Sequence, residues 1–284
     1  MTISVQNNIP KFYVIGDTKL NTQTFEKYLE EAGKSSIFKE WMKNNPEANK
    51  ISSLEKQLEL TGRCFGVFSD LKANNAEYMK QILKNPYSHF LLQQTNVNVF
   101  FENVSINFLF LIMRLQIDNL ALINEKITLD KLGFWLPPMM DQPAQKEAAL
   151  KFGLTCNKLA QGIEELLTFY RYNVLEKENA AVAEKIRSNI MRLMPVSAQF
   201  NLGINTSIVS WRQLLIRATD FLSEDELRYV FLMLAREFKT RYYSVFQDCV
   251  LEDTAGKQLG LDSLRTGTDD KAWYKYKLKF KLEA

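Results

Sequence analysis

Helical periodicity across the second half of the chain, punctuated by residues that start or stop helices, constrains the fold most strongly. Asp141, two residues before Pro143, suits a helix N-cap with proline in the first turn. This arrangement predicts a long amphipathic helix that begins after Asp141 and runs to about Tyr172. A second helix is expected over residues 180–194, because Pro195 cannot continue it.

Beyond Pro195 the pattern predicts shorter elements. Residues 196–205 suit a strand or a loop, and residues 207–217 suit a helix. Ser223 and Glu226 have the spacing of a capping box and predict another helix, running to about Phe246.

The first half predicts short helices followed by a strand. Asn96 to Phe101 alternates as a half-buried strand does, and residues 106–116 suit a buried helix, whereas Gly133 to Pro138 must be a rigid connection. Ser52 and Glu55 predict a capping box. The expected helices are Phe25–Ala32 ending at Gly33, Ser36–Asn44 ending before Pro46, and Leu54–Leu60 ending at Gly62.

The last stretch alternates apolar residues with lysines, from Tyr274 to Leu282, and predicts a strand with one basic face. Lysines on an edge strand commonly prevent sheets from aggregating edge to edge. A surface that binds a polyanion is the alternative interpretation.

Composition excludes several classes of protein. Hydrophobic residues at 46% and charged residues at 24% are typical of globular proteins, and a net charge of +3 does not indicate nucleic-acid binding. The longest apolar run, Ile106 to Met113, is too short to span a membrane. The N-terminus does not resemble a secretory signal, so a cytoplasmic protein is expected.

Few residues can carry familiar chemistry. Cys64, Cys156 and Cys249 are widely spaced, which favours buried free thiols over disulfides and indicates no metal site. His89 is the single histidine, and it is either a hydrogen-bonded structural residue or a ligand contact. The sequence contains neither a phosphate-binding glycine loop nor a GxSxG motif.

Arginines at the polar edges of apolar helices are the remaining candidates, since several that converge on a cleft would hold an anionic small molecule. Solvated helix edges and ordinary ion pairs are the alternative explanation. The set comprises Arg114, Arg192, Arg212, Arg217 and Arg228.

Residues 186–246 resemble the C-terminal core of the flavin-dependent thymidylate synthases. In that family a Leu-Pro ends one helix, and an extended segment, an Asn, a helix ending in Leu-x-Arg and a Glu-Ile-Arg helix follow. Met194-Pro195, Asn205, Ile216-Arg217 and Glu226-Leu227-Arg228 occupy these places in order.

Upstream, residues 83–119 resemble the segment that leads to the family's RHRxxSxNExSxRY motif. Ile112-Met113-Arg114 stands where Arg-His-Arg is expected, so Arg114 and Asn119 match the motif. Leu120 and Leu122 replace its Glu and the following Ser.

The resemblance implies an α+β fold, with long helices on a small mixed sheet, extra N-terminal helices and a C-terminal strand; periodicity alone predicts mostly helix. It implies three regions: residues 1–85, a core of residues 86–248, and a C-terminal extension of residues 249–284. It also implies a homo-oligomer with FAD as cofactor, folate as a second one, and methyl or hydroxymethyl transfer to a pyrimidine nucleotide. Arg114, Arg192 and Arg217 would bind the nucleotide or a related anion, and Asn119, Asn205 and His89 would bind the flavin.

Two other interpretations remain open. The apolar replacements at Ile112, Met113, Leu120 and Leu122 suit a protein that keeps the fold as an interaction or assembly component without catalysis, because apolar residues close a polar pocket. The chain is alternatively an unrelated helical binding protein.

Overall fold

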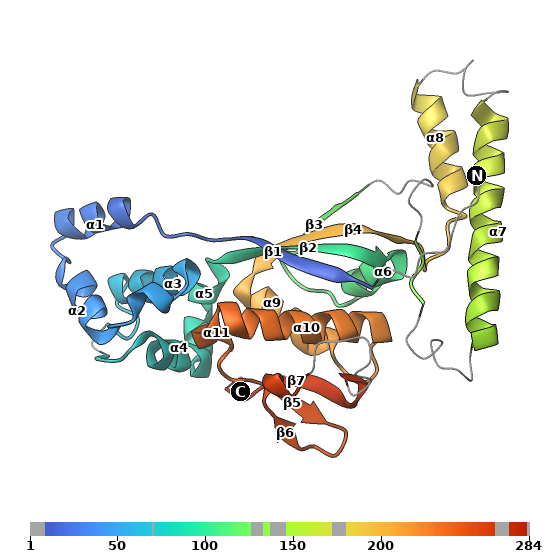
Figure 1. The fold of residues 1–284 in the computed structure, drawn as a ribbon. Helices are drawn as coiled ribbons and strands as arrows, with labels where there is room; N and C mark the ends of the chain where they lie inside the picture. Colours follow the sequence, from blue (N-terminus) through green and yellow to red (C-terminus); the bar gives the residue numbers. More distant parts are fainter. Residues whose placement is uncertain are drawn as a thin grey trace. The chain divides into compact units, whose positions relative to one another are not determined.

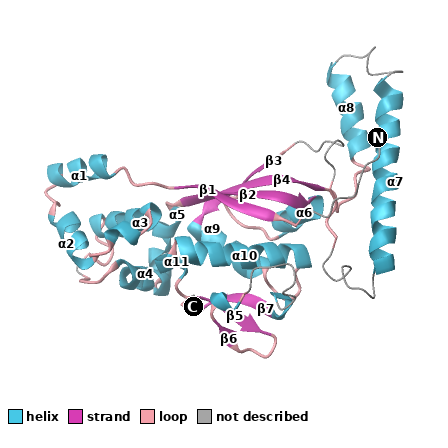
Figure 2. Cartoon of the chain, viewed as in Figure 1, coloured by secondary structure: helices cyan, strands magenta, loops and turns pink. Residues whose placement is uncertain are grey.

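In a computed structural model the chain has a helix-rich α+β fold, as expected (Figure 1, Figure 2). The structure describes residues 9–69, 71–125, 133–136, 146–171, 180–264 and 273–282. Within these ranges no helix is both long and apolar enough to cross a membrane.

Two units make up the chain. The first comprises Met1–Phe12, Phe100–Arg114 and Ile123–Gly203. The second comprises Tyr13–Val99, Leu115–Leu122 and Ile204–Ala284. The predicted boundaries at residues 85 and 248 stay a prediction.

Strands β2 and β4 contribute residues to both units, in a sheet of order β1-β2-β4-β3. The side-chain alternation predicted from Asn96 onward is confirmed, with Val97, Val99 and Phe101 buried. The four strands are β1 (Lys11–Asp17), β2 (Asn96–Ser105), β3 (Ala121–Asn124) and β4 (Gln199–Ser207).

A helical hairpin dominates unit 1 (Figure 1). Its core contains Cys156, Ala160 and Ile163, packed with Phe134 and Ile190. The predicted cap at Asp141 lies outside the described residues. The helices are α6 (Ile106–Arg114), α7 (Lys146–Tyr170) and α8 (Ala180–Met191).

The N-terminal part of unit 2 is formed by short helices. The capping box of Ser52 and Glu55 is confirmed. The prediction that the helix ends at Gly62 is wrong, because the helix continues to Cys64. A Cβ at position 62 would collide with Tyr78 Oη and lie 2.9 Å from Leu91 Cδ1. Glycine is therefore required here for close packing and does not end the helix. The elements are α1 (Thr22–Glu31), α2 (Ser36–Asn44), η1 (Ala48–Lys50), α3 (Ser53–Cys64), α4 (Asn75–Lys84), η2 (Pro86–Ser88) and α5 (His89–Gln93).

Two longer helices and a short one form the rest of the core of unit 2. The ring of Trp211 packs edge-on against Phe238, with centroids 5.2 Å apart, and its indole N–H donates to Val97 O over 3.0 Å. The helices are α9 (Ile208–Ala218), α10 (Asp225–Arg241) and α11 (Tyr243–Phe246).

Both predicted ends of α10 are corrected. Ser223 does not cap the helix: Glu224 holds the N-cap position, and the Ser223 hydroxyl donates to Arg217 O instead. The helix stops before Tyr242, whose backbone leaves the helical region while its hydroxyl donates to Asp17 Oδ2 over 2.8 Å. Burial, together with Asp17, raises the pKa of Tyr242, which therefore stays protonated as a donor.

The C-terminal strand of unit 2 is the edge of a three-stranded antiparallel sheet, order β6-β5-β7. Lys277 and Lys279 both pair with Glu252 on the neighbouring strand, at 3.3 and 3.0 Å. The predicted edge strand with basic residues is confirmed. The remaining elements are β5 (Cys249–Asp253), β6 (Gln258–Leu259), η7 (Leu261–Ser263), η8 (Trp273–Lys275) and β7 (Tyr276–Phe280).

Candidate functional site

Arg217 lies exposed in the last turn of α9 and binds the segment of residues 115–119. Its Nη1 donates to Leu115 O and, over 3.5 Å, to Gln116 O. Among the described residues, no hydrogen bond uses its Nε or Nη2. These donors suit a phosphate or carboxylate oxygen.

Two hydroxyls hold the same segment from β4 and α9. Ser210 Oγ donates to Asp118 O over 2.9 Å, and Thr206 Oγ1 donates to Asn119 O over 3.0 Å. Gln116 and Asn119 have φ values of 50° and 58°, in the left-handed region that residues other than glycine rarely adopt. The hydroxyls and Arg217 therefore fix a backbone that is unfavourable by itself.

We call Arg217, Ser210, Thr206 and the segment that they hold the clamp; it contains two of the residues selected from the sequence, Asn119 and Arg217. Asn205 precedes Thr206 in β4, where successive side chains point to opposite faces of the sheet, so its side chain is not part of the clamp. Asn119 and Asn205 are exposed, so their amides are accessible to a ligand.

Arg114 and Arg192 lie in unit 1, and both side chains are exposed. Arg114 ends α6. Arg192 follows α8, where its backbone N–H donates to Asn189 O over 3.3 Å. Their grouping with Arg217 around one ligand stays a prediction.

Arg212 and Arg228 are buried and have structural partners. Arg212 pairs with Asp248, and Arg228 Nη2 donates to the carbonyls of Tyr274 and Tyr276 over 2.7 and 3.0 Å. Burial lowers the pKa of Arg228, although its neighbour Asp225 favours the charged form. Neither arginine is accessible to a ligand.

His89 begins α5 and is half-buried. Its Nε2 lies 3.4 Å from Leu83 O, so the nitrogen nearest a partner faces a backbone carbonyl. This geometry favours the structural role over a ligand contact.

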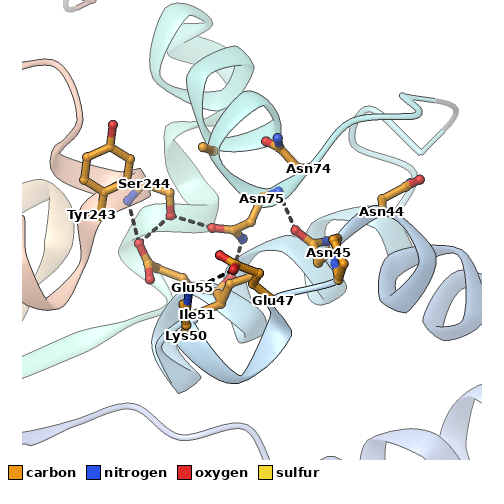
Figure 3. Close-up of a pocket in the computed structure, with 12 residues that line it drawn as sticks. Asn44, Asn45, Glu47, Lys50, Ile51, Glu55, Asn74, Asn75, Tyr243 and Ser244 are labelled. Carbon is orange, nitrogen blue, oxygen red and sulfur yellow. Dashed lines mark hydrogen bonds and ion pairs between the residues drawn. The ribbon is translucent and has the colours of Figure 1, made fainter.

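A second candidate, missed in the sequence, is a pocket of about 500 Å³ in unit 2 (Figure 3). Ser244 Oγ contacts both the Glu55 carboxylate and Asn75 Oδ1, the latter at 2.5 Å. Asn75 Nδ2 donates to Glu59 Oε2 over 2.8 Å. The capping motif at Ser52 was the one sequence signal near this pocket.

Internal partners satisfy the buried carboxylates of this network. Glu55 accepts from the backbone N–H groups of Ser52 and Ser244, and Glu59 pairs with Arg63 at 2.8 Å. The network therefore joins α3, α4 and α11, and we assign it a structural role.

The three cysteines are free and buried, as predicted. Burial raises the pKa of the Cys156 thiol, which keeps it in the unreactive protonated form. In the described parts of the chain, no group of three or more His, Cys, Asp or Glu side chains could hold a metal ion.

No protein-family model matches the chain, and no match is found among curated proteins. The clamp around residues 115–119 is consequently the basis for assigning a function.

Proposed function

We propose that this chain is a diverged member of the flavin-dependent thymidylate synthases that binds a pyrimidine nucleotide or a related anion through Arg217. The observation that carries this proposal is the clamp that joins Arg217 to the segment containing Asn119. The exposed guanidinium offers Nε and Nη2 to a phosphate, while Nη1 is held by backbone carbonyls. An arginine held on one side loses less side-chain entropy when it binds.

The nucleotide would place its phosphate at Arg217, whose Nε and Nη2 donors suit phosphate oxygens. Arg114 and Arg192 are the further candidates for anion contacts in a homo-oligomeric, cytoplasmic protein.

A flavin is the cofactor that this proposal implies, and when reduced it would supply the hydride that converts a methylene group from a folate into a methyl group on the pyrimidine. The exposed amides of Asn119 and Asn205 fit the polar edge of a flavin ring. His89 fits less well, because its Nε2 already faces Leu83 O.

One observation favours an interaction or assembly component as the second candidate. Ile112 stands at the first arginine of the family's motif and is fully buried in α6, so this position cannot contact a ligand. Met113 is 59% exposed and presents a thioether where the family has a histidine. A protein of this kind would bind neither nucleotide nor flavin.

Calorimetry with deoxyuridine monophosphate, deoxyuridine and FAD tests the proposal. Wild-type protein should bind the monophosphate more tightly than the nucleoside, and Arg217→Ala should weaken monophosphate binding by roughly tenfold or more. Arg187→Ala, which removes an exposed arginine on α8, is the matched control and should change nothing. Equal binding by wild type and Arg217→Ala would exclude this site, and no binding of nucleotide or flavin would favour the assembly component.

A further inference from the structure

Helix α7 carries two apolar seams in unit 1. The first seam is a complete 4-3 heptad pattern: Ala149, Gly153, Cys156, Ala160, Ile163, Leu167 and Tyr170. Cys156, Ala160 and Ile163 are buried in the core of the hairpin with α8, and Leu167 and Tyr170 pack against that core. We call this the inner seam.

The second seam has the same spacing, shifted by one residue: Ala148, Phe152, Thr155, Leu159, Gly162, Leu166 and Phe169. We call this the outer seam. Phe152 packs partly on the hairpin core. Leu159 and Leu166 are 45% and 39% exposed, although apolar residues at a and d positions normally face a partner helix.

Residue size alternates along the outer seam from Ala148 to Leu166. Ala148, Thr155 and Gly162 are small, whereas the positions between them hold Phe152, Leu159 and Leu166; at the C-terminal end the alternation stops, since Phe169 follows Leu166. A Cβ at Gly162 would meet no atom within 4 Å, so nothing described in the chain requires a glycine there. Glycine destabilises a helix interior, but small residues let a second helix approach closely.

From these features we infer that the outer seam binds the outer seam of a second copy of this chain, with the two α7 helices antiparallel. A two-fold axis between Ala160 and Gln161 places Leu159 opposite Gly162 of the other copy. The same axis sets Thr155 opposite Leu166. In these central pairs large residues fill the spaces above small ones, and the two-fold axis repeats each pair. At each end of the seam the axis places Phe152 opposite Phe169 of the other copy, so two aromatic rings meet there.

Charge specifies the antiparallel direction. Lys158 and Glu165 are exposed and occupy the same heptad position, on the flank of the outer seam that faces away from the inner seam. In an antiparallel pair related by a two-fold axis, the same flanks meet, so Lys158 of each copy lies across from Glu165 of the other. A parallel pair would instead direct this flank toward the side of the partner helix that packs on α8.

The other exposed leucines on α7 do not form a comparable seam. Leu150 and Leu154 are 63% and 53% exposed. The following positions on that face are polar, namely Asn157, Gln161, Glu164 and Thr168. Leu150 therefore provides a matched control for substitutions in the outer seam.

Sedimentation velocity of the full chain over a range of concentrations tests this interface, independently of nucleotide binding. Wild type should sediment as a dimer or an even multiple of it. Leu159→Glu should halve that stoichiometry, while Leu150→Glu should leave it unchanged. Circular-dichroism melting of each variant checks that the chain still folds.

A charge exchange tests the direction of pairing. Lys158→Glu and Glu165→Lys should each weaken self-association by about tenfold, since each places two like-charged pairs across the seam. The double variant K158E/E165K restores opposite charges and should recover wild-type association. A wild type that remains monomeric, or a Leu159→Glu protein that associates like wild type, would overturn the interface; charge variants without recovery in the double variant would overturn the antiparallel direction.

Discussion

The guanidinium of Arg212 and the carboxylate of Asp248 form a buried, two-pronged ion pair, with Nη1–Oδ1 at 3.0 Å and Nη2–Oδ2 at 2.8 Å. Both side chains are 2% exposed. Arg212 also donates to Val245 O and lies 3.9 Å from the centroid of the Phe280 ring. The pair thus links α9 to the residue before β5, and the Phe280 contact links the same guanidinium to the C-terminal strand β7, all within unit 2.

Asp248→Asn should lower the free energy of unfolding by about 3–5 kcal/mol, because it leaves a buried guanidinium without its counter-charge. Urea denaturation followed by circular dichroism measures the change. Glu237→Gln, which breaks the half-exposed pair with Arg241, is the control and should cost less than about 1 kcal/mol. If both variants lost the same free energy of unfolding, the buried pair would stabilise the fold no more than the half-exposed one.

Gly62→Ala should destabilise the fold by about 1–3 kcal/mol, since the added methyl group would displace Tyr78, whose hydroxyl donates to Val67 O over 2.7 Å. Thermal melting compares this variant with Gly260→Ala, where a Cβ meets no atom within 4 Å. If both variants melt at the same temperature, the close contact at Gly62 does not limit the size of the side chain at that position.

Glu252 makes stability depend on pH through its two lysines. Hydrogen bonds from Lys279 and Lys277 hold the pKa of Glu252 below its usual value. The folded state therefore gains stability above the pKa of the unfolded chain and loses it as pH falls through the lower folded pKa.

Glu252→Gln should consequently be less stable than wild type at neutral pH, with a difference that disappears in acid. Denaturant midpoints measured from neutral to acidic pH give this difference directly, and added salt should reduce it. A difference that stays constant with pH would show that the effect comes from the shape of the side chain rather than from its charge.

Thr206→Val should cost about 1 kcal/mol by removing the hydrogen bond to Asn119 O. The left-handed backbone at Asn119 should then become mobile, which hydrogen exchange at residues 115–120 would detect as faster exchange. Thr240→Val removes an exposed hydroxyl that bonds within its own helix and serves as the control. Unchanged exchange in Thr206→Val would assign the rigidity of the segment to Arg217 and Ser210.

Local sequence determined many of the elements, because caps and side-chain periodicity act over a few residues. The helix predicted at Ser36–Asn44 has those bounds, and Ser52 with Glu55 forms the predicted capping box. The alternation from Asn96 identified β2, and the isolated cysteines proved to be buried and free. In each case the signal and the structure it specifies lie within one turn or one strand.

Only the tertiary structure decided the roles of residues whose partners are distant in sequence. From the sequence, Gly62 was expected to end a helix, but in the structure it allows Tyr78 to pack closely against α3. Arg212 was expected to lie at a solvated helix edge, but it is buried and pairs with Asp248. The clamp of Arg217 on Leu115 joins positions 102 residues apart. Sequence spacing does not predict such contacts, because they depend on how the packed elements bring distant side chains together and not on local propensity.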